Sequence, residues 1–250
     1  MKKILKPILL QSIAGIVTAV SIFIGSFIYG RIEVRNLENQ RLSGLYLSVS
    51  KEYINELFGI PFVSIKDLNG LSNDFYFLNN GVLRVVSDDG LVVAYFITID
   101  KQGDTIRVLS PDGMNSVVLG KATYHSISPE LDYGTSIVTE ALYKRSSVLY
   151  CEKYNGWRGT DFNPYYYAVF DYGFFNENWD LFFDLWKQLK DESGESVDYD
   201  KLLNERKSLK PNTFGTIDPE YEDKVKIDID FDQWPNISRI IENRKVLSRR

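Results

Sequence analysis

The chain has little of the chemistry that most metal and thiol sites require. Its 250 residues include one cysteine, Cys151, and one histidine, His125. A single cysteine excludes an internal disulfide and any zinc or iron–sulfur site built from several thiolates. A single histidine excludes a histidine-rich metal site and counts against a Ser-His-Asp triad. We therefore expect no metal site and no cofactor, and the sequence identifies no catalytic residue.

Nucleotide-binding and hydrolase motifs are also missing: the chain holds no Walker motif, G-x-G-x-x-G, G-x-S-x-G or H-E-x-x-H. Basic character is lacking as well, since the net charge is −5 and three of the Lys and Arg residues precede residue 30, where no acid occurs. The rest of the chain is therefore more acidic than the net charge suggests, and we expect no nucleic-acid partner.

The first strong positive feature is an uncharged apolar run, Ile8–Tyr29, of 22 residues. As a helix this run is about 33 Å long, enough for a hydrocarbon core of about 30 Å. A cleaved signal peptide is the alternative, but the run is longer than usual and no A-x-A-like site follows. We predict a retained transmembrane helix within residues 1–30 and a single-pass membrane protein. Gly15 and Ala19 form a small-xxx-small pair, which favours homo-oligomers through this helix.

The orientation of the span depends on its flanking charges. Three lysines precede it and three arginines follow it: Lys2, Lys3, Lys6, Arg31, Arg35 and Arg41. The terminal amine tips the balance, so the positive-inside rule slightly favours a large domain outside the cytoplasm. Residues 31–44 lack a continuous apolar stripe and are interpreted as a juxtamembrane linker.

Residues 50–58 have the clearest local pattern of a helix. Ser50 suits an N-cap and Glu52 places an acid in the first turn. Gly59 can adopt the left-handed conformation that ends a helix, and Pro61 prevents its continuation.

Four strand-like segments follow this helix, separated by short turns that contain glycine. They are Asp74–Leu78, Val82–Ser87, Leu91–Ile99 and Thr105–Leu109. We predict a four-stranded antiparallel meander.

The helix followed by a meander resembles the SmpA/BamE-like family of small bacterial envelope proteins. Ser50, Ile54, Gly59 and Pro61 match the spacing of the family's helix motif, together with Leu57 and Phe58, and the turn 88–90 matches its acidic-Gly turn. Ser48 stands where the family usually has glycine, and the family's lipid-anchoring cysteine is absent. The resemblance covers about residues 45–100 and implies a fold rather than an activity.

Residues 111–250 are predicted to form an aromatic-rich α+β region packed with the preceding unit, 45–110. Strands are expected at 115–119, 147–152, 165–172 and 225–231, and helices at 178–190, 197–209 and 236–246. The stretch 135–154 is ambiguous, because Ile137, Val138, Ala141 and Leu142 suit a helix. The fold class is therefore α+β: a transmembrane helix, an antiparallel meander and packed amphipathic helices.

Aromatic residues crowd between 154 and 186. Helical spacing of Trp179, Phe182, Phe183, Trp186 and Leu189 favours burial in a core. Trp157, Tyr166 and Tyr172 fall outside this pattern, and we predict that they face solvent as candidate binding residues. The alternating Asp228, Asp230 and Asp232 could bind a hard cation, but a solvated strand face is the preferred interpretation.

Two functions remain compatible with these features. The first is a protein-interaction or scaffolding module held at the membrane by one span. The alternative is a membrane-tethered enzyme, or a glycan- or lipid-binding domain, that uses carboxylates and exposed aromatics.

Overall fold

The computed structural model describes residues 20–21, 23–24, 36–99, 103–109, 115–128, 135–138, 148–155, 164–170, 181–182, 184–185 and 199–225. The chain divides into two compact units, 1–44 and 45–250. In the first unit residues 36–43 are helical. Among the described residues no helix is both long enough and apolar enough to cross a membrane. Most of the predicted span, Ile8–Tyr29, lies outside them.

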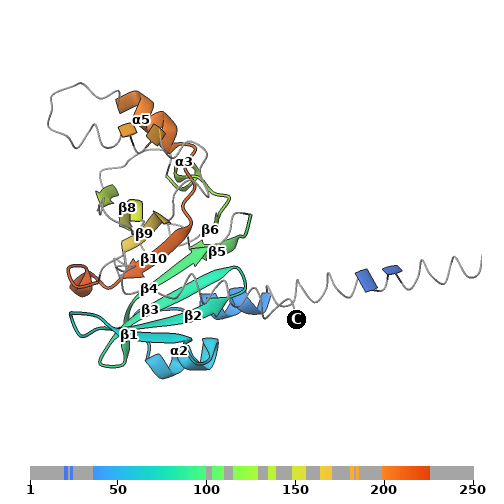
Figure 1. Cartoon of the computed structure of the whole chain (residues 1–250), viewed down its shortest axis with the longest axis vertical. Helices are drawn as coiled ribbons and strands as arrows, with labels where there is room; N and C mark the ends of the chain where they lie inside the picture. Colours follow the sequence, from blue (N-terminus) through green and yellow to red (C-terminus); the bar gives the residue numbers. More distant parts are fainter. Residues whose placement is uncertain are drawn as a thin grey trace, which may run out of the picture. The chain divides into compact units, whose positions relative to one another are not determined.

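The second unit is built on an eight-stranded sheet in which every neighbouring pair is antiparallel (Figure 1). The spatial order is β1-β2-β3-β4-β10-β9-β8-β7. The strands are β1 (Val63–Lys66), β2 (Ser72–Leu78), β3 (Gly81–Asp88), β4 (Leu91–Ile99), β7 (Thr135–Val138), β8 (Val148–Asn155), β9 (Pro164–Phe170) and β10 (Thr213–Ile217). The α+β class is therefore confirmed.

The sheet consists of two four-stranded meanders that meet at their last strands, β4 and β10. Each meander runs from an outer edge to the centre, β1 to β4 and β7 to β10. One row of paired residues crosses all eight strands: Val63, Phe75, Arg84, Phe96, Gly215, Tyr166, Lys153 and Ser136. Both halves follow the same strand order from edge to centre, and their central strands, β4 and β10, are antiparallel. A local two-fold axis between Phe96 and Gly215 therefore relates the first meander to the second.

Helix α2 (Lys51–Phe58) forms as the sequence indicates. The Ser50 hydroxyl accepts a hydrogen bond from the Tyr53 amide, and the Gly59 amide donates to the Asn55 carbonyl at 2.8 Å. Gly59 has φ +83° and ψ −158°, a backbone conformation that is unfavourable for residues other than glycine. The predicted start, end and terminating glycine of this helix are confirmed.

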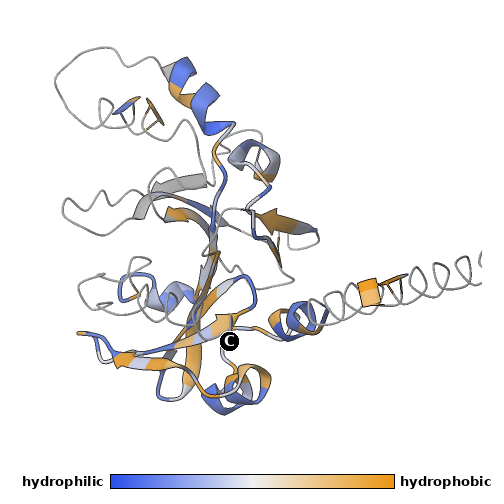
Figure 2. Ribbon diagram, turned by 45° about the vertical axis from the view of Figure 1, so that its right-hand side comes forward, coloured by the Kyte–Doolittle hydropathy of each residue, from blue (hydrophilic) through white to orange (hydrophobic). Residues whose placement is uncertain are grey.

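The other described helices are short. α3 (Tyr124–Ile127) was not expected, although its start has a capping box. The Thr123 side chain accepts a hydrogen bond from the Ser126 amide, and the Ser126 side chain accepts one from the Thr123 amide. α5 (Tyr199–Arg206) lies within the predicted helix 197–209, and a 3₁₀ turn, η1 (Pro219–Tyr221), follows β10. Figure 2 shows α5 as largely hydrophilic and the first meander as largely hydrophobic. The described residues of the predicted helix 178–190 are helical, and Phe182 is buried.

The predicted meander is correct for three of its four strands. The fourth, β5 (Ile106–Leu109), leaves the main sheet and pairs with β6 (Ser116–Leu119) in a separate two-stranded sheet. It cannot pair with β4, because β10 occupies that edge. Strand β10 was not predicted: its central Gly215 resembles a turn signal, but a Cβ there would lie 2.2 Å from the Phe96 ring.

The structure corrects some other expectations, and some concern residues that it does not describe. Ile137 and Val138 lie on a strand, β7, and not on a helix, because β8 pairs with them. In the turn between β3 and β4, Gly90 has a positive φ of 82°, as its glycine favours; Asp89 also has a positive φ, of 45°, which the sequence did not predict. Gly81 is needed instead for close packing, since a Cβ would lie 2.1 Å from the Thr98 oxygen. The predicted strand 225–231, beyond Val225, and the helix 236–246 lie outside the described residues.

Replacing Gly59 tests the helix terminus. We expect Gly59→Val to lower the free energy of unfolding by about 1–3 kcal/mol, because a β-branched residue is strained at this φ and ψ. Urea unfolding of the full chain in detergent measures the effect. The neighbouring Ile60→Val is the control, since Ile60 is exposed. Equal stability of the two variants would contradict the helix-ending conformation at Gly59.

Candidate functional site

Two acid-x-tyrosine triplets occupy equivalent positions in the two meanders. In β2 the triplet is Asp74–Tyr76 and in β8 it is Glu152–Tyr154. Phe75 and Lys153 belong to the same row across the sheet, so the acids before them are related by the local two-fold. Both carboxylates are completely buried on the sheet face that contacts α2 and α5, here called the helix face.

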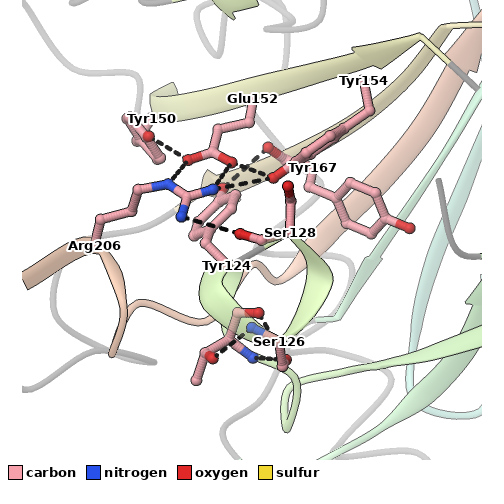
Figure 3. A network of polar contacts seen from close by, with 9 residues as sticks. Tyr124, Ser126, Ser128, Tyr150, Glu152, Tyr154, Tyr167 and Arg206 are labelled. Atoms are coloured by element: carbon pink, nitrogen blue, oxygen red, sulfur yellow. Dashed lines mark hydrogen bonds and ion pairs between the residues drawn. The ribbon is translucent and has the colours of Figure 1, made fainter. Parts of the chain in front are cut away.

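Glu152 forms a bidentate ion pair with Arg206 (Figure 3). Arg206 Nε lies 2.6 Å from Glu152 Oε1 and Arg206 Nη2 lies 2.7 Å from Oε2. The guanidinium also donates to the Ser128 carbonyl at 3.3 Å and sits over the Tyr124 ring. Paired, planar hydrogen bonds of this kind are the strongest form of Arg–carboxylate contact.

Tyrosines complete the coordination of the carboxylate. Tyr150 and Tyr154, from the same strand as Glu152 and pointing to the same face, each donate a hydroxyl to one carboxylate oxygen. Tyr124 donates to the Tyr167 carbonyl at 3.0 Å, and Tyr167 donates to the Leu109 carbonyl. We call Glu152, Arg206, Tyr124, Tyr150 and Tyr154 the tyrosine–carboxylate cluster.

The cluster forms because short local patterns meet. Tyr150, Glu152 and Tyr154 are two residues apart on β8 and so share one face. Leu202 and Arg206 are four residues apart on α5, and both are buried. Phe182 adds an edge-to-face contact with the Tyr150 ring at 4.9 Å between ring centres.

Burial and charge shift the acidity of these groups in one direction. Burial, followed by the Glu152 charge, raises the pKa of Tyr124, Tyr150 and Tyr154. Burial alone would lower the pKa of Arg206, but its bonds to Glu152 and the charge of that carboxylate raise it overall. At neutral pH the tyrosines are therefore neutral donors and Arg206 is a cation.

Asp74 has a simpler arrangement of the same kind. Lys51 Nζ, from the first turn of α2, lies 2.6 Å from Asp74 Oδ2, and the Ser64 hydroxyl donates to Oδ1. Tyr76 donates to Asn55 of α2 at 2.9 Å instead of to the acid. Each meander thus buries one carboxylate against a cation from a helix.

These contacts leave the Glu152 carboxylate little capacity for chemistry. Both oxygens of Glu152 accept charged and neutral donors at once, and a general base needs an oxygen that a substrate proton can reach. Among the described residues no group of three or more His, Cys, Asp or Glu side chains could hold a metal ion. The geometry is that of a structural network.

Of the three predicted binding residues, the structure describes Tyr166. Tyr166 is 3% exposed, so the expectation that it faces solvent is wrong. It lies on the face opposite the helix face, in a cluster with Phe96 and Cys151. Burial, then the charge of Glu222, raises its pKa. Trp157 and Tyr172 lie outside the described residues.

The surroundings of the lone cysteine and of the lone histidine do not indicate a reactive site. Cys151 is buried, and burial followed by the Glu152 charge raises the pKa of its thiol, which disfavours the reactive thiolate. His125 lies on the exposed side of α3. Sequence reasoning did not single out Glu152 or Arg206. The available signal was an acid between two tyrosines on the buried face of a strand.

No protein-family model, curated protein or solved structure matches the chain. The resemblance of residues 45–100 to the SmpA/BamE-like family stays a prediction.

Breaking the ion pair should be costly. Arg206→Met leaves a buried carboxylate without its cation, and we expect a loss of about 3–5 kcal/mol in the free energy of unfolding. The double variant Glu152→Gln/Arg206→Met should recover part of that loss, because neither charge is then buried alone. Urea unfolding measures both, with exposed Lys207→Met as the control. An Arg206→Met variant as stable as the control would contradict a stabilising pair.

Alkaline pH should destabilise the fold through the buried tyrosines. Tyrosines in the unfolded chain lose a proton near pH 10, whereas Tyr124, Tyr150, Tyr154 and Tyr166 hold theirs. The native state then binds more protons, so stability falls above about pH 10, by up to about 1.4 kcal/mol per pH unit for each such tyrosine. Unfolding curves between pH 8 and 12 measure the slope, which Tyr154→Phe should reduce. A stability that is constant to pH 12 would contradict these shifts.

Proposed function

We propose that the chain is a membrane-anchored protein-interaction module whose described residues serve binding and not covalent chemistry. The observation that carries this proposal is the contrast between its ionisable and its apolar groups. The buried acids are already neutralised by Arg206 and Lys51. Large apolar side chains instead stand in solvent at one edge of the sheet.

That edge is strand β1, and two loops flank it. Ile60, before the strand, is 92% exposed, and Leu68, after it, is 94% exposed. They are the two most exposed large apolar side chains among the described residues. A single exposed leucine needs no explanation, but two at opposite ends of one edge strand favour a contact surface. We propose that a protein partner covers Ile60 and Leu68.

The anchor is the second part of the proposal. The run Ile8–Tyr29 is long and apolar enough to cross a bilayer, and the described Val20, Phe23 and Ile24 within it are helical and exposed. Lipid would cover such side chains. Self-association through Gly15 and Ala19, and a large domain outside the cytoplasm, belong to the same proposal. Trp157 and Tyr172 are further candidates for the partner contact.

The SmpA/BamE-like resemblance also belongs here. Two backbone conformations, one before α2 and one at its end, support it. The terminating Gly59 has a positive φ, and Ser48, where the family usually has glycine, also has a positive φ of 63°. Glycine is the residue that adopts this conformation at no steric cost.

Photo-crosslinking in membranes tests this function. Benzoylphenylalanine at position 68 of the full chain should give a crosslinked product with a second protein in carbonate-washed membranes. The distant Ile60→Asp change should abolish that product if both residues contact one partner. The same probe at exposed Lys207 is the matched control. Release of the chain by carbonate would contradict the anchor. Adducts with lipid alone would contradict the protein partner and favour a lipid-binding domain.

A further inference from the structure

Among the described residues, strand β1 pairs with β2 alone and leaves its other edge open. Ser64 and Lys66 on this strand are exposed, as are Ile60 before it and Leu68 after it. We propose that a second copy of this chain adds its own β1 to this edge, antiparallel, about a two-fold axis at Ser64. The inference rests on the proposed function and names the partner that covers Ile60 and Leu68.

The backbone of β1 has hydrogen-bonding groups to offer a further strand. Just beyond the β1–β2 pair, the Asp67 amide donates to the Leu71 carbonyl at 2.9 Å. Residues of an antiparallel pair alternate between hydrogen-bonded and non-hydrogen-bonded positions, so Ile65, two residues earlier, also bonds to β2. The amides and carbonyls of Ser64 and Lys66 therefore point away from β2, toward the open edge.

Ser64 lies midway between the two most exposed large apolar side chains. Ile60 is four residues before it and Leu68 is four residues after it, and they are 92% and 94% exposed. When two copies of β1 run antiparallel about Ser64, Ile60 of each copy lies opposite Leu68 of the other. The surface then covers itself at both ends, which is what an isologous two-fold contact requires.

The side chains within the strand agree with this register. Val63 and Ile65 are partly exposed on the face opposite the helix face, where they pack against Phe75. About an axis at Ser64, Val63 of each copy lies opposite Ile65 of the other. Each half-buried apolar side chain thus gains an apolar neighbour, and such cross-strand pairs stabilise a sheet.

The charge on the strand selects this register over its neighbours. Lys66 is the only charged residue of β1. An axis at Lys66 would place the two lysines directly opposite each other, which is destabilising. An axis at Ile65 would keep them diagonal neighbours, about 7–8 Å apart, and would leave Ile60 without Leu68. With the axis at Ser64 the two lysines lie four residues apart along the strands.

The contact is small, and it joins no more than two chains. One short strand and two loops offer much less than the roughly 1,200–2,000 Å² that stable interfaces bury. The proposed anchor compensates, because copies held in one membrane meet at a high effective concentration. Each copy uses its single β1 edge in the pair, so the contact does not propagate.

Single cysteines in the full chain, oxidised mildly in membranes, test the axis. Ser64→Cys should shift the chain to twice its monomer mass on a non-reducing gel. Two residues on the axis have Cα atoms about 5.5 Å apart, which is within the range of a disulfide. Lys66→Cys is the matched control, since Lys66 is exposed on the same strand but would lie about 13 Å from its copy. The native Cys151 is buried and is retained in every variant.

A second pair of variants checks the same register and keeps the hydrogen bond between Ser64 and Asp74. Ile60→Cys and Leu68→Cys, on chains with different tags in one membrane, should form a disulfide-linked heterodimer. Each variant alone should not dimerise through its new cysteine, because each position lies eight residues along the strands from its own copy. Both native residues are exposed, so neither change removes a core side chain.

Equal dimer formation by Ser64→Cys and Lys66→Cys, or no disulfide dimer in either experiment, would overturn the inference. The photo-adduct at position 68 separates this failure from a failure of the proposed function. An adduct of twice the chain mass supports the second copy. An adduct with a different protein would overturn the second copy and leave the proposed function standing, whereas adducts with lipid alone would contradict both.

Discussion

The buried carboxylate of Glu152 constrains more of the second unit than any other single group. A charge without solvent must be neutralised and hydrogen-bonded where it lies. That requirement brings Arg206 from α5 onto the sheet and aligns Tyr150 and Tyr154 on β8. Arg206 in turn binds the chain at Ser128, just after α3. One ion pair thereby fixes three elements that are distant in sequence.

The two meanders solve the same problem with different residues. Asp74 and Glu152 hold equivalent positions, yet a lysine from α2 neutralises one and an arginine from α5 the other. The compact lysine contacts one oxygen, whereas the planar guanidinium contacts both. The second half also gathers aromatic rings around its acid, and the first half packs aliphatic side chains such as Leu83 and Val85 on that face. The repeated feature is the buried pair and not the sequence around it.

Local signals allowed much of the first half to be predicted. Helix α2, three strands and the turn at Asp89 and Gly90 depend on residues close in sequence. Strand β10 could not be predicted, because Gly215 is explained only by the Phe96 ring of a strand far away in the chain. For the same reason Tyr166 was misjudged: its burial depends on partners from other strands. The Glu152–Arg206 pair joins residues 54 apart and has no local pattern.

The position of β10 has a consequence for synthesis of the protein. The first meander is complete once residue 99 has been made, but the strand that covers the β4 edge begins at Thr213. Until then β4 is an open edge that carries Tyr95, Phe96 and Ile97, at the middle of the future sheet. Unpaired apolar strands of this kind are prone to aggregate while a chain is being made. Synthesis of the stretch between these strands is therefore the period in which a nascent chain most needs chaperone protection.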